Sequence, residues 1–353
     1  MEREKRERRF VGIDLGKRDY TMAIIGVDGK ARFHCGKTCN KGRQAMYGLL
    51  KATDKVALEA GNLAFIVARE IQERVGSTVR VLNAAKLPYI WDAPTKTDKE
   101  DALKLAHLVE ERRDEKLPIV PLPSDKELAR RKVMASYDRT MRHRVKHINT
   151  LHAIFVHQGN TEIVKSDLAT DSRRREAIEM LSGHEREEAE WILKYLELFE
   201  ERLKELKKVI HAEAKEDEDM IVLQSIPGIG PLIAYAFVAY VGNGSRFSKG
   251  SQVSNYLGFV PRLDYSGTIQ RHGHISKRGN GYLRALLVQA AWALVRSEQG
   301  GALAERYLYL IGRGASKKKV IVSIGRRMAE LMYSVLRSKT MYESRQWVVP
   351  KSA

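Results

Sequence analysis

Apolar residues gather in short runs at the start of the chain, and polar turns separate these runs. Residues 10–15 and 20–27 are too short for helices and are rich in strand-forming residues. Asp28-Gly29, between the second run and residues 30–35, is a hairpin signal. We therefore expect three strands within residues 10–38, and the first carries a single carboxylate, Asp14, near its end.

Strand and helix patterns then alternate. Residues 55–59 and 78–82 predict two further strands, and the first of these ends in Glu59. Helical spacing of apolar residues predicts helices at 63–75, 84–91 and 98–113. Three strands followed by a strand, a helix, a strand and helices is the element order of a ribonuclease-H-like α/β domain.

Four carboxylates fall at informative places on this expected fold. Asp14 and Glu59 lie near the ends of strands, whereas Asp98 and Asp101 share one face at the start of a helix for which Thr97 is the expected N-cap. A favourable charge near a helix N-terminus would explain Asp98 alone. An acid in a core strand is costly unless it is paired or holds a cation. Four converging acids would repel one another without hard cations, so we expect them to bind two Mg²⁺ ions.

Beyond Pro118, Pro121 and Pro123 the pattern becomes helical. Residues 125–215 are almost free of Pro and Gly, which predicts long helices. One of them carries an apolar stripe at spacings of three and four, typical of a coiled coil or helical bundle and of a dimer contact. The stripe consists of Ile192, Tyr195, Leu196, Phe199, Leu203, Leu206 and Ile210. His143 and His147 have a spacing that a metal could use, but a surface facing nucleic acid is the favoured interpretation.

A second compact region begins near residue 220. Residues 225–230 are the glycine-rich turn of a helix-hairpin-helix, and residues 232–241 form its second helix. Gly228 and Gly230 would expose backbone N–H groups to a phosphate without reading base sequence. The alternative is a tight turn between helices that binds nothing.

A basic, glycine-punctuated segment follows between Tyr256 and the helix expected at 283–295. We expect a loop that grips phosphates around a reacting centre. Its cations are Arg262, Arg271, Lys277, Arg278 and Arg284. Ser266 is placed to approach a phosphodiester, with Ser276 as a rival, and chemistry alone leaves both open.

The overall charge points to a polyanionic partner. Lys and Arg number 62 against 44 Asp and Glu, which gives a net charge of +18. Nucleic acid is the usual partner for such a surface, and the alternative is a basic protein without one. Only two cysteines, Cys35 and Cys39, are present, so we expect a reducing, cytoplasmic location. Neither a signal peptide nor a membrane span is expected.

Two sets of motifs, in the same order, resemble the DEDD-type transposases of the insertion-sequence 110 family, which include Piv-like DNA invertases and bridge-RNA-guided recombinases. The N-terminal set is Gly12-Ile13-Asp14, Leu58-Glu59, Lys96-Thr97-Asp98 and Asp101-Ala102. The C-terminal set is Ile226-Pro227-Gly228-Ile229-Gly230, Tyr256-Leu257-Gly258, Pro261-Arg262, Ser266-Gly267 and residues 275–280. The resemblance covers nearly everything from residue 10 to about residue 337.

The resemblance implies a fold, a chemistry and partners. The fold would be a disordered leader (1–9), a RuvC-like domain (10–117), a helical coiled-coil connector (118–219), a helical serine-bearing transposase domain (220–340) and a tail (341–353). Asp14, Glu59, Asp98 and Asp101 would hold Mg²⁺, and Ser266 would be the nucleophile that cuts and rejoins DNA. Donor and target DNA, a guide RNA and a homodimer or tetramer, associated with the nucleoid, are the implied partners and setting.

Other function classes remain as alternatives. A metal-dependent nuclease of the junction-resolvase type would use the four carboxylates with water as the nucleophile, and would leave Ser266 without a task. A sugar-kinase or chaperone ATPase would share the run from Gly12 to Gly16, but the chain has no second phosphate loop. A catalytically inert RNA-binding protein would tolerate replacement of the acids.

Overall fold

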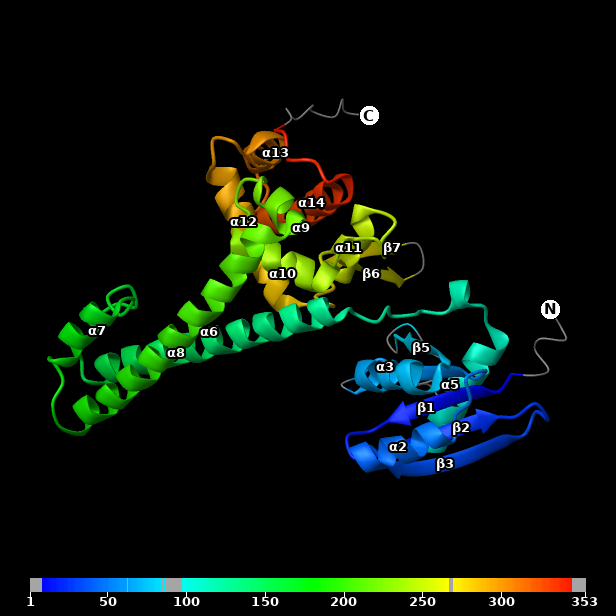
Figure 1. Cartoon of the computed structure of the whole chain (residues 1–353). Helices are drawn as coiled ribbons and strands as arrows, with labels where there is room; N and C mark the ends of the chain where they lie inside the picture. Colours follow the sequence, from blue (N-terminus) through cyan, green and yellow to red (C-terminus); the bar gives the residue numbers. More distant parts are fainter. Residues whose placement is uncertain (1–7, 62, 84–85, 87–96, 267–268, 345–353) are drawn as a thin grey trace. The chain divides into compact units, whose positions relative to one another are not determined.

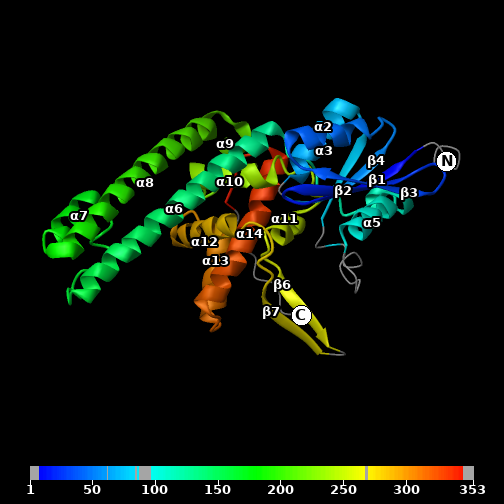
Figure 2. The same cartoon turned by 90° about the horizontal axis from the view of Figure 1, so that it is seen from below.

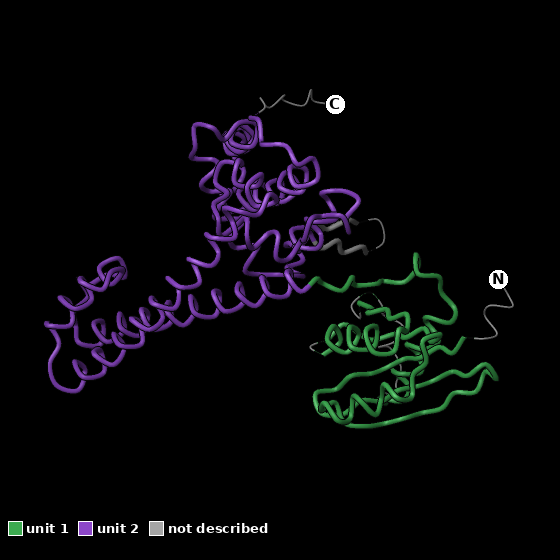
Figure 3. Tube along the Cα trace, viewed as in Figure 1, with its two compact units in different colours: residues 1–124 green, residues 125–353 purple. Residues whose placement is uncertain are grey.

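In the computed structural model, residues 1–124 and residues 125–353 form two compact units (Figure 3). The structure describes residues 8–61, 63–83, 86, 97–266 and 269–344. For residues 262–266 and 269–272 it describes the backbone alone. Residues 118–123 belong to the first unit, because the Val120 N–H donates to the Val81 carbonyl at 2.7 Å and Ile119 bridges to Leu82. Most of the expected connector, 118–219, belongs to the second compact unit together with the residues that follow it.

A five-stranded sheet forms the centre of the first unit, and the five strands predicted there are confirmed. They are β1 (Phe10–Leu15), β2 (Asp19–Ile25), β3 (Ala31–Lys37), β4 (Lys55–Glu59) and β5 (Thr78–Leu82). Their order across the sheet is β3-β2-β1-β4-β5. β1 pairs antiparallel with β2 and parallel with β4, and β4 pairs parallel with β5. The carboxyl ends of β1, β4 and β5 therefore share one edge of the sheet.

Helices cover both faces of this sheet (Figure 2). α2 (Asn40–Gly48) and α3 (Ala64–Val75) bury Met46 and Val67 against the face formed by Val11, Ile13 and Leu58. α5 (Asp98–Glu111) covers the other face. The helices expected at 63–75 and 98–113 are thus confirmed, α2 was not predicted, and the helix expected at 84–91 lies almost wholly outside the described residues.

α5 lies directly on β1 because Gly12 has no side chain. A Cβ at Gly12 would lie 1.9 Å from the Ala102 carbonyl oxygen and 2.5 Å from the Ala106 nitrogen. Ala102 and Ala106 are themselves small and fully buried. This close approach positions the start of α5 against the sheet.

Two long antiparallel helices form an arm in the second unit (Figure 1). α6 (Asp125–His157) runs beside α8 (Gly183–Glu216), with the short α7 (Asp171–Ile178) near the far end. Ion pairs join Arg130 to Glu213 near one end and Arg144 to Glu200 further along, as antiparallel helices require. Most of the predicted stripe on α8 is buried against the same chain, whereas Tyr195 is 47% exposed. The dimer contact stays a prediction.

The rest of the second unit is a helical domain around the apolar helix α10. Its elements are α9 (Glu218–Gln224), α10 (Pro231–Val241), α11 (Gly250–Tyr256), β6 (Pro261–Ser266), β7 (Ile269–Ile275), α12 (Gly281–Arg296), α13 (Gly301–Gly312) and α14 (Lys317–Ser338). Ala236, Phe237 and Ala239 of α10 are fully buried. The loop predicted between Tyr256 and Arg284 is wrong, because a β-hairpin occupies most of it. No helix in the described part of the chain is long and apolar enough to cross a membrane.

Candidate functional site

Asp14 and Glu59 are neighbours at the edge of the sheet. Ile13 pairs with Leu58, and the two acids follow directly on parallel strands. Side chains alternate along a strand, so both acids share the face of Gly12 and Ala57, the face that α5 covers. Both are partly buried, and both interact with other described residues.

The start of α5 points to the same edge. Just after the end of α5, Asp114 binds Lys55 Nζ at 3.1 Å, at the beginning of β4. The helix therefore runs opposite to β4, and its first turn lies toward the strand ends. Thr97 caps that turn by accepting from the Glu100 N–H at 3.3 Å, as predicted.

The two acids of α5 differ in environment. Asp101 is 6% exposed, whereas Asp98 is exposed to solvent. The Asp101 Oδ1 atom is buried and has no hydrogen-bond partner among the described residues, and Lys104 Nζ lies 3.8 Å from it. A buried carboxylate oxygen that accepts no hydrogen bond is costly unless a cation lies near it, and in the structure the Lys104 ammonium is that cation.

The donors suit Mg²⁺ in kind, since it takes hard carboxylate oxygens. Within the described ranges, however, no group of three or more His, Cys, Asp or Glu side chains is close enough to hold a metal ion. The structure thus places Asp14, Glu59 and the first turn of α5 toward one edge, and one buried oxygen of Asp101 accepts no hydrogen bond there. Magnesium binding by the four acids stays a prediction.

Ser266 ends the first strand of a hairpin in the second unit. Its backbone pairs with that of Ile269, the first residue of the second strand. Asp264 pairs with Arg271, and the register shifts between Pro261 and Leu263. The side chains of Arg262, Ser266 and Arg271 lie outside the description, so their predicted roles stay predictions.

Residues 256–260 and 276–279, here called the clasp, hold the base of this hairpin. The Ser276 N–H donates to the Val260 carbonyl at 2.7 Å, and the Lys277 N–H donates to the Gly258 carbonyl at 3.2 Å. Lys277 has a positive φ of 53°, an uncommon conformation for a residue with a side chain. Ser276 Oγ is buried without a hydrogen-bond partner in the described part of the chain.

Arg284 of α12 joins the two segments of the clasp through hydrogen bonds to their backbone. Its Nη1 atom donates to the carbonyls of Leu257, Arg278 and Gly279 at 2.8, 3.2 and 3.3 Å. Burial lowers the pKa of the Arg284 guanidinium. Sequence reasoning placed Arg284 among cations that contact nucleic acid, but in the structure its Nη1 binds three backbone carbonyls. Lys277 and Arg278 are exposed.

The predicted helix-hairpin-helix turn lies between α9 and α10. Gly228 has a φ of 83°, and a Cβ there would lie 2.6 Å from the Ala290 carbonyl oxygen of α12. Gly228 is therefore required for close packing within the domain. Gly230 is the N-cap of α10 and has open space around it. Phosphate binding by this turn stays a prediction.

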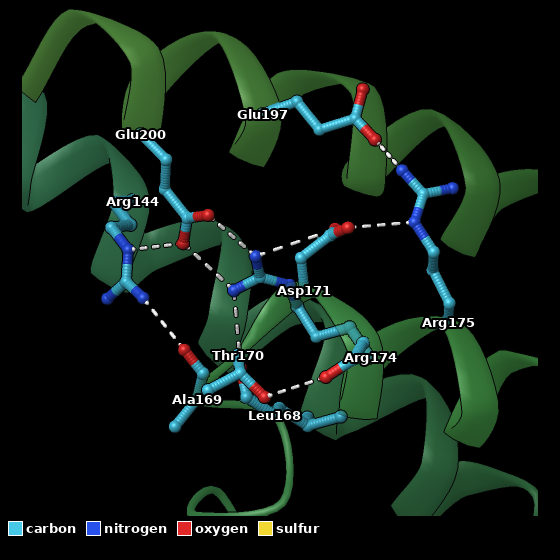
Figure 4. Close-up of polar contacts among 10 residues, drawn as sticks. Arg144, Leu168, Ala169, Thr170, Asp171, Arg174, Arg175, Glu197 and Glu200 are labelled. Atoms are coloured by element: carbon cyan, nitrogen blue, oxygen red, sulfur yellow. Dashed lines mark hydrogen bonds and ion pairs between the residues drawn. The ribbon is translucent and has the colours of Figure 1, made fainter. Parts of the chain in front are cut away.

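Sequence reasoning missed a buried ion cluster in the arm (Figure 4). Arg174 is fully buried, and its Nη1 and Nη2 atoms bind Glu200 at 3.0 and 2.8 Å. Arg144 Nε binds the same carboxylate at 2.8 Å, and Arg144 Nη2 donates to the Ala169 carbonyl at 3.1 Å. Burial alone would raise the pKa of Glu200, but the hydrogen bonds from both arginines bring it below its ordinary value. The cluster thus joins α6, α7 and α8.

The two arm histidines contact aromatic side chains. His143 stacks on Phe199 with ring centroids 5.7 Å apart, and His147 lies 5.4 Å from Tyr195 and 5.1 Å from Phe199. His147 Nδ1 also bonds to the His143 carbonyl at 2.8 Å. The four-residue spacing of His143 and His147 therefore places both rings on the face of α6 that packs against α8.

Comparisons with known proteins find transposases that are similar to this chain. The profile described as Transposase IS116/IS110/IS902 family matches residues 220–307, from α9 into α13. A protein of Pseudomonas aeruginosa named "Probable family 20 transposase" is 28% identical over 338 residues, 94% of this chain and 98% of its own length. The transposase for insertion sequence element IS1111A of Coxiella burnetii is 41% identical over 104 residues, 29% of each chain. The pilin gene-inverting protein of Moraxella lacunata is 28% identical over 125 residues, 35% of this chain and 38% of its own.

Proposed function

Because this chain belongs to the IS116/IS110/IS902 transposase family, we propose that it cuts and rejoins DNA through a covalent link to Ser266. The observation that carries the proposal is the place of Ser266 at the tip of a hairpin rooted inside the matched domain. A hairpin tip can enter a DNA groove or reach a strand that the body of the domain cannot approach. Ser276, the rival nucleophile, has its hydroxyl buried.

The chemistry would be a transfer of one phosphodiester bond. Ser266 Oγ attacks the phosphorus, the Oγ–P bond forms, and the bond from phosphorus to one deoxyribose oxygen breaks. The serine proton leaves to a base, and the departing oxygen takes up a proton. A deoxyribose hydroxyl of the second DNA then attacks the phosphoserine and releases Ser266. The link preserves the phosphodiester energy, so no ATP is needed.

The first unit would assist this reaction. Its strand order, β3-β2-β1-β4-β5, supports assignment to a RuvC-like, ribonuclease-H-type domain. Asp14, Glu59, Asp98 and Asp101 would hold Mg²⁺, which would supply positive charge to the phosphate oxygens. The close contact between α5 and β1 at Gly12 would fix how the carboxylates on these two elements are oriented. Lys277 and Arg278, exposed at the clasp, would bind phosphates of the DNA backbone.

A structured RNA from the same mobile element would choose the DNA sites, and a dimer or tetramer would bring donor and target together. The net charge of +18 supports binding of more than one nucleic-acid chain. Phosphate contacts of the kind expected here do not read base sequence. Sequence choice would then come from base pairing to the RNA.

A denaturing gel for a protein–DNA adduct tests the proposal. Full-length protein, Mg²⁺, labelled donor and target DNA, and RNA transcribed from the flanking element are combined, with Ser266→Ala, Ser276→Ala and Asp14→Ala in parallel. We expect an adduct from the wild type and from Ser276→Ala, and none from Ser266→Ala or Asp14→Ala. Cleavage without an adduct, lost in Asp14→Ala but kept in Ser266→Ala, would instead identify a metal-dependent nuclease. Full activity without RNA would exclude the guide.

A further inference from the structure

Aromatic rings and guanidinium groups alternate beside the base of the β6–β7 hairpin. The Arg246 guanidinium lies 4.6 Å from the Phe247 ring centroid and 4.5 Å from that of Tyr256. The two rings are 5.5 Å apart and tilted by 54°. Arg131 of α6 lies 5.9 Å from the Tyr240 ring, and Arg246 Nη2 donates to the Tyr240 carbonyl. These five residues, from α6, α10, α11 and the loop before α11, are called the aromatic patch.

Backbone carbonyls hold the two arginines of the aromatic patch in place. Arg131 Nε donates to the Ala239 carbonyl at 2.8 Å, so backbone oxygens fix both guanidinium groups. Neither forms an ion pair with a carboxylate among the described residues, and Arg246 Nε is buried without a hydrogen-bond partner there. Arg130, one residue before Arg131, is by contrast paired with Glu213 and Asp217. The local charge is therefore available to an anion.

Tyr256 is the open member of the aromatic patch. It is 36% exposed, although it ends α11 and its backbone begins the clasp. The partly buried Arg246 and Phe247 side chains contact its ring. Exposed Lys277 and Arg278 lie in the other segment of the same clasp. A rigid aromatic side chain thus meets solvent within a group of cations.

We propose that the aromatic patch binds an unpaired stretch of nucleic acid, with a base stacked on Tyr256 and phosphates on Arg246 and Arg131. Stacking aromatic residues between cations are the usual features of single-strand binding sites, because every base has a π-face. Bases in an intact duplex are already stacked on one another and cannot reach a tyrosine. The proposal rests on the proposed function, since strand exchange must separate a cut strand from its complement before rejoining it.

Binding of short DNAs by the full chain tests the site. A single strand of about fifteen nucleotides carrying 2-aminopurine and a duplex of the same sequence are titrated without Mg²⁺, in the Ser266→Ala background, so that no chemistry intervenes. We expect Tyr256→Leu to weaken single-strand binding roughly 5- to 150-fold, the range for one lost stack, with duplex binding unchanged. Tyr256→Phe, which keeps the ring, should bind like the parent. Arg246→Gln should lower the salt slope by about one phosphate contact.

A matched control is the same change at another tyrosine beside an arginine. Tyr309 lies 5.6 Å from the Arg313 guanidinium on α13, outside the aromatic patch. Tyr309→Leu should leave single-strand binding unchanged. An equal loss in Tyr309→Leu, or a loss in Tyr256→Phe as large as in Tyr256→Leu, would overturn the proposal.

The parent protein alone supplies a second readout, which does not depend on folding of a variant. Stacking on Tyr256 should quench 2-aminopurine when the single strand binds. Binding without any quenching, wherever the probe is placed along the strand, would contradict the site. Neither result depends on the serine link, so failure of the aromatic patch and failure of the adduct test are separate outcomes.

Discussion

Gly258 and Gly279 each lie where the other's segment leaves no room for a side chain. A Cβ at Gly258 would lie 2.0 Å from the Arg278 carbonyl oxygen, and a Cβ at Gly279 would lie 2.1 Å from the Tyr256 carbonyl oxygen. Both glycines have positive φ, 75° and 91°. At the base of the hairpin the two backbone segments therefore approach so closely that each requires a glycine.

Gly258→Ala should force the two clasp segments apart and so displace the hairpin. The added methyl group meets backbone atoms, which cannot move aside as a flexible side chain can, and the residue must also keep a left-handed conformation. We expect strand cleavage and adduct formation to fall about 100-fold, as for a reacting group displaced by about 1 Å. The measurement is the single-turnover rate of adduct formation at saturating DNA.

Gly312→Ala is the matched control for the clasp. Gly312 ends α13, and a Cβ there would have nothing within 4 Å. The rate should stay at the wild-type value. If Gly258→Ala reacted as fast as Gly312→Ala, the clasp would have no part in placing Ser266.

Arg284→Ala should reduce the reaction rate and leave DNA affinity unchanged. Its Nη1 binds three carbonyls of the clasp, so the residue acts on the position of the hairpin and not on a phosphate. We expect the single-turnover rate to fall, with an unaltered Kd for duplex DNA and an unaltered salt dependence of that Kd. Arg284→Lys, which retains one donor group, should recover part of the rate.

Arg278→Ala is the comparison for Arg284, because Arg278 is exposed in the same clasp. Loss of one phosphate contact there should lower the slope of log K against log salt by about 1. A similar change of slope in Arg284→Ala would show that Arg284 binds the DNA backbone after all.

Elements whose own sequence has a clear pattern of apolar and polar residues could be predicted. β4 and β5 have the predicted limits, 55–59 and 78–82, because each is a short apolar run bounded by polar residues. α2 was missed because Gly42 and Gly48 lie within it and its first turns are polar. The β6–β7 hairpin was read as a loop because backbone pairing and the clasp hold it, and neither leaves an apolar pattern.

In the candidate site, likewise, some features follow from local sequence patterns and others depend on contacts between distant residues. Parallel pairing forces the ends of β1 and β4 to one edge, so the neighbourhood of Asp14 and Glu59 follows from the strand pattern. The place of Asp101 depends on where α5 crosses the sheet, and that crossing is set by Gly12 through a contact about ninety residues away along the chain. The Arg174–Glu200 pair was missed for a related reason: α7 is almost entirely polar, and nothing near Arg174 in the sequence indicates burial.

Gly12→Ala should destabilise the first unit and separate α5 from β1. Because the new Cβ would lie 1.9 Å from the Ala102 carbonyl, the helix must shift, at a cost of about 3 kcal/mol for such overpacking. Asp101 would move with the helix, so Mg²⁺-dependent DNA cleavage should be lost as well. Thermal unfolding and cleavage are both measured, with Gly48→Ala as the control, since nothing lies within 4 Å of a Cβ there. Wild-type stability of Gly12→Ala would contradict the observed packing.

Glu200→Gln should loosen the arm, and the loss should depend on pH. Without the carboxylate, the fully buried Arg174 loses its nearest ion-pair partner and keeps only Asp171 at 3.8 Å, and breaking such a pair costs about 3–5 kcal/mol. The pKa of Glu200 is lowered in the folded protein from an ordinary value of 4.5. Its contribution is therefore complete above about pH 4.5 and is lost as the pH falls through the lower, folded-state pKa. Wild-type protein should lose arm stability on acidification in this window.

Glu197→Gln, one turn earlier on α8, is the matched control. Glu197 pairs with Arg175, but both side chains are about half exposed, at 45% and 55%, and an exposed pair contributes less than about 1 kcal/mol. Protection of arm amides against hydrogen exchange, followed from pH 7 to pH 3, separates the two variants. At pH 7 we expect Glu200→Gln to exchange much faster than the wild type and Glu197→Gln to match it, with the difference between wild type and Glu200→Gln shrinking as the pH falls. A constant difference over the whole range would mean that the ionised carboxylate of Glu200 does not stabilise the arm.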